Sequence, residues 1–157
     1  MAALPHIIFV TAARWTPGGG ASTANTACNS DTNKPASYAS TTFKALLNGN
    51  SATVSGTSYY QKDGTTLIAV ATSGNLIAGS NGSNPTSDLT NPITKDYVGG
   101  NVWTGAGSNN CNNWASSQSS DNAGVGSQAS KEVIATWWNN NGPITCNTQA
   151  FLDCVSQ

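Results

Sequence analysis

The sequence predicts an α+β domain with few helices, short strands and unusually long loops. Short apolar runs of β-branched and aromatic residues are separated by long stretches of Asn, Ser, Thr and Gly, which is typical of short strands joined by loops. One segment has the spacing of a helix with a buried face. The 157-residue chain is 38% hydrophobic and contains five tryptophans, enough for a single domain over residues 1–157 with an ordinary core.

The first two elements are a strand and a helix. The apolar run at residues 7–11 predicts the strand, and a Pro- and Gly-rich turn follows it. A helix is expected over residues 24–33, with Ser22 or Thr23 as its cap. In that helix the side chain of Cys28 faces inward.

The later elements are predicted to be short. Residues 43–47 form an apolar segment, either helical or extended, and the turn at residues 62–65 indicates a hairpin. Residues 73–100 are rich in Ser, Asn, Gly, Thr and Pro, which predicts a long irregular excursion. The remaining expectations are a polar loop at residues 109–128 and strand candidates at residues 102–105, 137–138 and 151–155.

The charge balance argues against several classes of partner. Six Lys and Arg residues face seven Asp and Glu residues, for a net charge of -1, so no basic stripe is available for nucleic acid or anionic lipid. The chain has 19 Asn, 19 Ser and 19 Thr residues, a composition that we associate with secreted or surface-exposed bacterial domains. No apolar run approaches the roughly 20 residues of a membrane span. We therefore expect an extracellular or cell-surface location, the leader being absent from this chain.

The four cysteines predict structural disulfides. Their number is even and no C-x-x-C pair occurs, which argues against zinc and against a redox site. Three pairings remain open at this point. The nested one joins Cys28 to Cys154 and Cys111 to Cys146.

Nothing in the sequence indicates an enzyme, and no catalytic residues are assigned. His6 is the only imidazole, so a Ser-His-Asp or Cys-His arrangement would depend on it alone. The chain lacks the nucleophile-elbow, phosphate-loop and zinc-protease motifs. Asp121 and Glu132 could in principle form the carboxylate pair that hydrolyses a glycosidic bond. Two acidic residues out of seven are weak evidence for such a pair.

Several motifs follow one another in a family's order: Cys28, Val102-Trp103-Thr104-Gly105, Asn110-Cys111-Asn112-Asn113-Trp114, Trp137-Trp138-Asn139-Asn140-Asn141, Cys146 and Phe151-Leu152-Asp153-Cys154-Val155. This series resembles the C-type lectin-like domains, and nearly the whole chain resembles most closely a bacterial surface-protein domain of unknown function with that fold. The resemblance implies the nested cysteine pairing, terminal strands drawn together, and a long-loop face that binds a partner without catalysis.

Calcium is a feature of the sugar-binding members of that family, which hold it with an E-P-N-type loop and the Asn-Asp of a W-N-D triplet. Here Asn139 and Asn140 follow the tryptophans, and the Asp of the W-N-D triplet is missing. The segments most similar to the E-P-N loop begin at Asn84 and Asn91, and neither contains a Glu. Because calcium takes 6–8 oxygen ligands with carboxylates among them and the expected acidic ligands are missing, we expect no cofactor, with calcium as the alternative left open.

The candidate ligand-binding residues combine an aromatic surface with amides. Sugar recognition needs a flat apolar platform, and amides that donate to and accept from neighbouring hydroxyls. Trp114 lies in a polar segment and is the aromatic residue expected to be exposed. The amides chosen with it are Asn112, Asn113, Asn139 and Asn140.

Two functions follow from these observations. The first is a non-catalytic extracellular binding module or adhesin domain that recognises a glycan or a host or cell-surface receptor through the long-loop face. The alternative is a structural subunit of an extracellular fibre or appendage without a small ligand, which predicts self-association into filaments. In the alternative, the N-terminal strand pairs with the sheet edge of a neighbouring copy. A third possibility, an adhesin tip fused to a stalk, predicts trimers.

Overall fold

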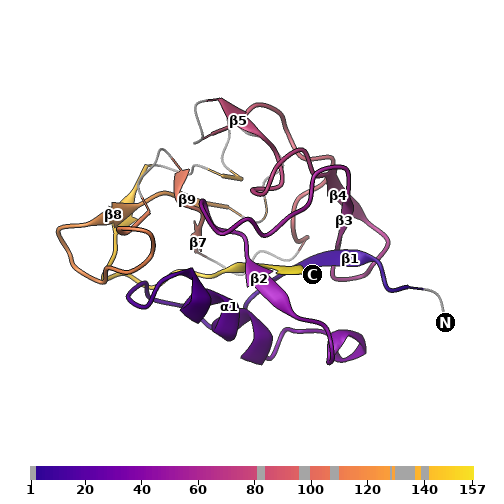
Figure 1. Ribbon diagram of the computed structural model, residues 1–157, viewed down its shortest axis with the longest axis horizontal. Coiled ribbons are helices and arrows are strands. Elements are labelled where there is room, and N and C mark those ends of the chain that lie inside the picture. The colour runs from indigo at the N-terminus through magenta and orange to yellow at the C-terminus, as the bar shows by residue number, and fades with distance from the viewer. Residues whose placement is uncertain are drawn as a thin grey trace.

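A five-stranded sheet forms the centre of the protein, and helix α1 lies against one of its faces (Figure 1). The computed structural model describes residues 3–80, 84–95, 100–106, 110–127, 129, 137–138 and 142–157. The elements in chain order are β1 (His6–Val10), α1 (Ala21–Ser30), the 3-10 helix η1 (Ala36–Tyr38), β2 (Phe43–Ala45), β3 (Ser58–Gln61), β4 (Leu67–Val70), β5 (Gly79–Ser80), β6 (Asn84–Pro85), β7 (Val102–Trp103), β8 (Asn122–Ala123), β9 (Val125–Gly126), β10 (Ile144–Thr145) and β11 (Asp153–Ser156).

The first and last strands are neighbours in the middle of this sheet. The strand order is β2-β11-β1-β3-β4, with β1 antiparallel to β11 and parallel to β3. The predicted first strand is confirmed. Because β1 has a partner strand on both sides, however, it offers no free edge, and the expectation that it pairs with a neighbouring copy is wrong.

Helix α1 is confirmed, but it begins and ends three residues earlier than predicted. Gly20, with φ 77° and ψ 174°, takes the cap position in a conformation that glycine adopts easily. The hydroxyl of Thr23 donates back to the Gly20 carbonyl at 2.9 Å instead of capping the helix. Asp31 is extended and ends the helix. The inward face predicted for Cys28 is correct, since this residue is fully buried.

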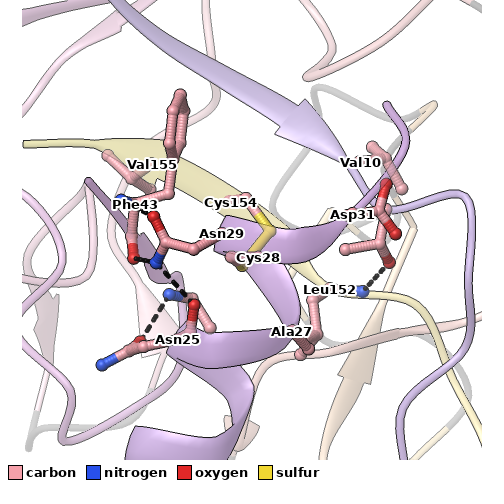
Figure 2. The surroundings of a disulfide bond; sticks show 12 residues. Val10, Asn25, Ala27, Cys28, Asn29, Asp31, Phe43, Leu152, Cys154 and Val155 are labelled. Carbon is pink, nitrogen blue, oxygen red and sulfur yellow. Dashed lines mark hydrogen bonds between the residues drawn. A yellow bond between two sulfur atoms is a disulfide. The ribbon is translucent and has the colours of Figure 1, made fainter. Parts of the chain in front are cut away.

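Two disulfides pin the fold, and their pairing is nested. Cys28 of α1 bonds to Cys154 of β11 (Figure 2). Cys111 bonds to Cys146. The first bridge therefore fixes the helix against β11, which lies between β2 and β1. Disulfides persist in oxidising compartments, which places the protein in such an environment.

Both edges of the sheet are covered by side chains or loops. On β2, the amide of Asn29 donates to the Phe43 carbonyl at 2.8 Å and accepts the Phe43 N–H at 2.9 Å, as a neighbouring strand would (Figure 2). Asn25 accepts the N–H of Ala45 at 2.8 Å. On β4, the Ile68 carbonyl accepts the N–H of Thr90 at 2.7 Å. Edges covered in this way resist pairing with another chain.

The remaining elements agree in part with the sequence predictions. The hairpin is confirmed as β3–β4, and the segment at residues 43–47, predicted as helical or extended, contains strand β2. The excursion at residues 73–100 contains the short β5–β6 ladder, and the polar loop at residues 109–128 contains β8 and β9. Trp137 and Trp138 form bends rather than the expected strand, and both are buried in the core.

No helix within the described ranges is long and apolar enough to cross a membrane.

Removing either disulfide should destabilise the protein, and the longer loop should matter more. The bridges close loops of 126 and 35 residues, for which chain entropy predicts losses of roughly 5 and roughly 4 kcal/mol on replacing each cysteine pair by alanine. Urea unfolding of the two double variants measures these losses. A Cys28→Ala/Cys154→Ala protein as stable as the wild type would contradict the role given to that bridge.

Candidate functional site

A turn with left-handed backbone lies at the centre of the candidate site. Cys111, Asn112, Asn113 and Trp114 are four consecutive residues with φ between 51° and 67°, and none is glycine. This conformation costs roughly 1–2 kcal/mol per residue, and asparagine tolerates it better than most residues. Such strain persists only where the surroundings hold it in place. We call these four residues the left-handed turn.

The buried side chain of Trp114 holds one end of this turn in place. Its side chain is only 2% exposed, and the indole Nε1 donates to the carbonyl of Asn48 at 3.1 Å. The ring lies between those of Trp15 and Trp103, with centroids 6.2 and 6.0 Å away. The expectation that Trp114 is exposed is therefore wrong, because its ring fills the space between two other tryptophans.

Backbone contacts and a disulfide hold both ends of the turn. The N–H of Cys111 donates to the Asn122 carbonyl at 3.1 Å, and the sulfur of Cys111 is bonded to Cys146. At the other end, the carbonyl of Trp114 accepts the N–H groups of Gly18 and Gly20 at 3.0 and 2.9 Å. The turn is thus connected to β8, to the segment before β11 and to the start of α1.

The two asparagines of the turn are exposed to solvent. The Asn113 side-chain oxygen accepts a hydrogen bond from the Asn110 amide at 3.1 Å, and the Asn113 N–H donates to Asn110 Oδ1 at 3.0 Å. No hydrogen bond within the described residues uses the side-chain amide of Asn112.

Neutral polar side chains surround these asparagines. Asp121 is the only charged residue that the structure describes between positions 100 and 149. The antiparallel pair β8–β10 supports this region. Its exposed side chains are those of Asn112, Asn113, Ser117, Gln118, Ser119, Ser120, Asn122, Thr145, Asn147, Thr148 and Gln149. We call these residues the amide surface.

Asn139 and Asn140, the other two predicted ligand residues, lie outside the described residues. The structure therefore brings together Asn112 and Asn113 of the predicted set as exposed neighbours of buried Trp114.

A partly exposed tryptophan was missed by the sequence analysis. Trp103, Trp114, Trp137 and Trp138 are buried, whereas Trp15 keeps partial exposure and lines a hollow of about 360 Å³ beside α1. Both Trp15 and Trp114 stand in polar, loop-forming sequence, so no local pattern distinguishes them. Long-range packing decides which one reaches solvent.

Among the described residues, Asp63 and Asp153 have shifted carboxyl pKa values, and each shift has a structural cause. Hydrogen bonds from the backbone N–H groups of Thr66 and Thr65 lower the pKa of Asp63 to about 2, within the β3–β4 hairpin. Burial raises the pKa of Asp153 to about 7, and its Oδ1 has no hydrogen-bond partner among the described residues. Within the same part of the chain, no group of three or more His, Cys, Asp and Glu residues is arranged to hold a metal ion.

Neither a protein-family model nor a curated protein matches this sequence.

The backbone of the left-handed turn should respond differently to glycine and alanine. Asn112→Gly removes the side-chain clash of a φ of 52°, whereas Asn112→Ala keeps it without the tolerance of asparagine. We expect the glycine variant to be about 1 kcal/mol more stable than the alanine variant. Urea denaturation measures the difference, and two variants of equal stability would show that the turn is not strained at this position.

Replacing Asp153 by Asn should change how stability depends on pH. The folded protein holds a proton on Asp153 up to about pH 7, whereas the unfolded chain releases it near the ordinary value of 3.8. Stability of the wild type therefore falls as pH rises through this window. We expect the stability of Asp153→Asn relative to the wild type to rise by up to about 4 kcal/mol between pH 4 and pH 7. Denaturation at both pH values tests this, and a constant difference would contradict it.

Proposed function

We propose that the chain is a C-type lectin-like, non-catalytic binding module of an extracellular or cell-surface protein, and that its amide surface recognises a neutral glycan. Three features support the fold assignment. The disulfides are nested, the terminal strands β1 and β11 are paired, and the first helix is bonded to the last strand.

The observation that carries the binding proposal is the left-handed turn. Four consecutive strained residues are held by a buried tryptophan, a disulfide and backbone hydrogen bonds, and they present two adjacent asparagines to solvent. Strain of this kind concentrates at functional sites. A rigid backbone also lowers the entropy cost of ordering the amides when a ligand binds.

The chemistry of the surface favours a neutral polyhydroxylated ligand. Each asparagine amide both donates and accepts hydrogen bonds, which matches adjacent sugar hydroxyls. The described part of this region has a single carboxylate and no cation, so neither a phosphate nor an acidic polymer finds a partner. Each hydrogen bond contributes about 0.5–1.5 kcal/mol net, so the affinity for one sugar unit is modest.

A catalytic role has less support from the same residues. All four cysteines are in disulfides, so none is available as a thiol nucleophile. The carboxyl with the most raised pKa, Asp153, is 2% exposed within strand β11. The His6 ring lies at the start of β1, where its Nδ1 is 3.4 Å from the Ser156 carbonyl.

A glycan array tests the proposal with the wild type, Asn112→Gly and Asn112→Asp. We expect the wild type to bind neutral glycans. Both variants should lose at least about fivefold of that signal, about 1 kcal/mol, because one removes the amide and the other replaces its donor with a charge. Ser40→Gly, an exposed position before β2, is the matched control and should bind as the wild type does.

Two results would overturn the proposal. One is a wild-type protein that binds no glycan on the array. The other is an Asn112→Gly protein that keeps full binding. The glycine variant retains the conformation of the turn, so its loss of binding reports on the amide and not on folding.

A further inference from the structure

Asn110, directly before the left-handed turn, has a fixed backbone. It forms an isolated antiparallel bridge with Ala123 of β8, and its carbonyl accepts the N–H of Trp114 at 2.7 Å. Ala123 is fully buried, and Cys111, the next residue after Asn110, is bonded to Cys146. The side chain of Asn110 therefore starts from a well-defined position beside the exposed asparagines of the turn.

Two hydrogen bonds join the Asn110 side chain to Asn113. Asn110 Oδ1 accepts the backbone N–H of Asn113 at 3.0 Å, and Asn110 Nδ2 donates to Asn113 Oδ1 at 3.1 Å. A backbone N–H can only donate, so the first bond fixes which end of the Asn110 amide is the oxygen. The other end is an NH₂ group, which also can only donate, so its partner on Asn113 is the oxygen. The backbone thus determines the orientation of both side-chain amides.

This orientation decides which group Asn113 presents. The oxygen and the nitrogen of an amide diverge from the same carbon, so the NH₂ group of Asn113 is turned away from Asn110. One of the two lone pairs of Asn113 Oδ1 is used by Asn110. Because Asn113 is exposed, it meets a ligand chiefly as a hydrogen-bond donor. An asparagine without such a neighbour could rotate its amide and present either group.

We infer that Asn110 is a positioning residue for the amide surface: it sets Asn113 as a donor, so the surface selects glycans that place an acceptor oxygen opposite Asn113. This inference rests on the proposed glycan binding. Two neutral groups of sugars supply such an oxygen, namely a hydroxyl and the carbonyl of an acetamido group. A ligand group that can only donate would face another donor there, and both would lose the hydrogen bonds that they make with water.

Hydrogen exchange in the ligand-free protein tests the orientation. In the wild type, the slower side-chain N–H of Asn110 should exchange at least about threefold more slowly than those of Asn113, because it donates to Asn113 Oδ1. In Asn110→Asp, the carboxylate still accepts the backbone N–H of Asn113 but cannot donate. The Asn113 amide should therefore rotate, donate to the carboxylate and gain the slow exchange. ¹H–¹⁵N NMR measures both, and unchanged shifts outside the amide surface show that the variant is folded.

Titration with the methyl β-glycosides of glucose and N-acetylglucosamine tests the specificity. We expect the wild type to bind at least one of them, and tighter binding of the second would identify the acetamido carbonyl as the acceptor. Asn110→Asp should weaken this binding at least about fivefold, because the Asn113 donor is withdrawn. Asn113→Asp, which removes the same donor directly, should show a similar loss. Ser55→Asp adds the same charge at an exposed position outside the amide surface and should bind as the wild type does.

The outcomes separate this inference from the proposed function. Faster exchange at Asn110 than at Asn113 in the wild type, or unchanged glycoside binding in Asn110→Asp, would overturn the inference and leave the amide surface as a binding site. A wild type that binds neither glycoside would also overturn it. An array on which the wild type binds no glycan would overturn the proposed function as well. Loss of array binding in Asn112→Gly but not in Asn110→Asp would support the proposed function alone.

Discussion

The disulfide between Cys28 and Cys154 is the constraint on which the rest of the structure depends. It bonds the first helix to the last strand, and that strand lies beside β1 in the middle of the sheet. Helix α1 and strands from both ends of the chain are thereby held in one unit, and side chains or loops cover both edges of the sheet. The disulfide closes a loop that contains most of the chain, so it lowers the conformational entropy of the unfolded state. This stabilises the folded state of a domain with a small core.

Trp114 connects the segment before α1 to the left-handed turn. Its ring is buried between Trp103 and Trp15, its carbonyl holds the glycines before α1, and its backbone ends the left-handed turn. One buried side chain thus positions the exposed asparagines and supports the half-exposed indole of Trp15.

Sequence patterns correctly predicted the elements that are determined by residues close together in the sequence. The β-branched run of β1 and the Asp-Gly turn of the β3–β4 hairpin occur where they were expected. The start of α1 was missed, because the cap depends on the unusual backbone of Gly20 rather than on a hydroxyl. For the candidate site, the exposure expected for Trp114 was wrong, whereas the binding role assigned to Asn112 and Asn113 stays a prediction.

The sequence by itself determined the α+β class, the even set of cysteines, the inward face of the helix and the low charge of the loops, because each follows from residue type and short-range spacing. The tertiary structure alone decided which tryptophan is buried and which backbone is strained. These properties depend on contacts such as Trp15 with Ala150 and Trp114 with Asn48. Such contacts join residues that no local pattern relates, so solvent exposure is settled only when the whole chain has packed.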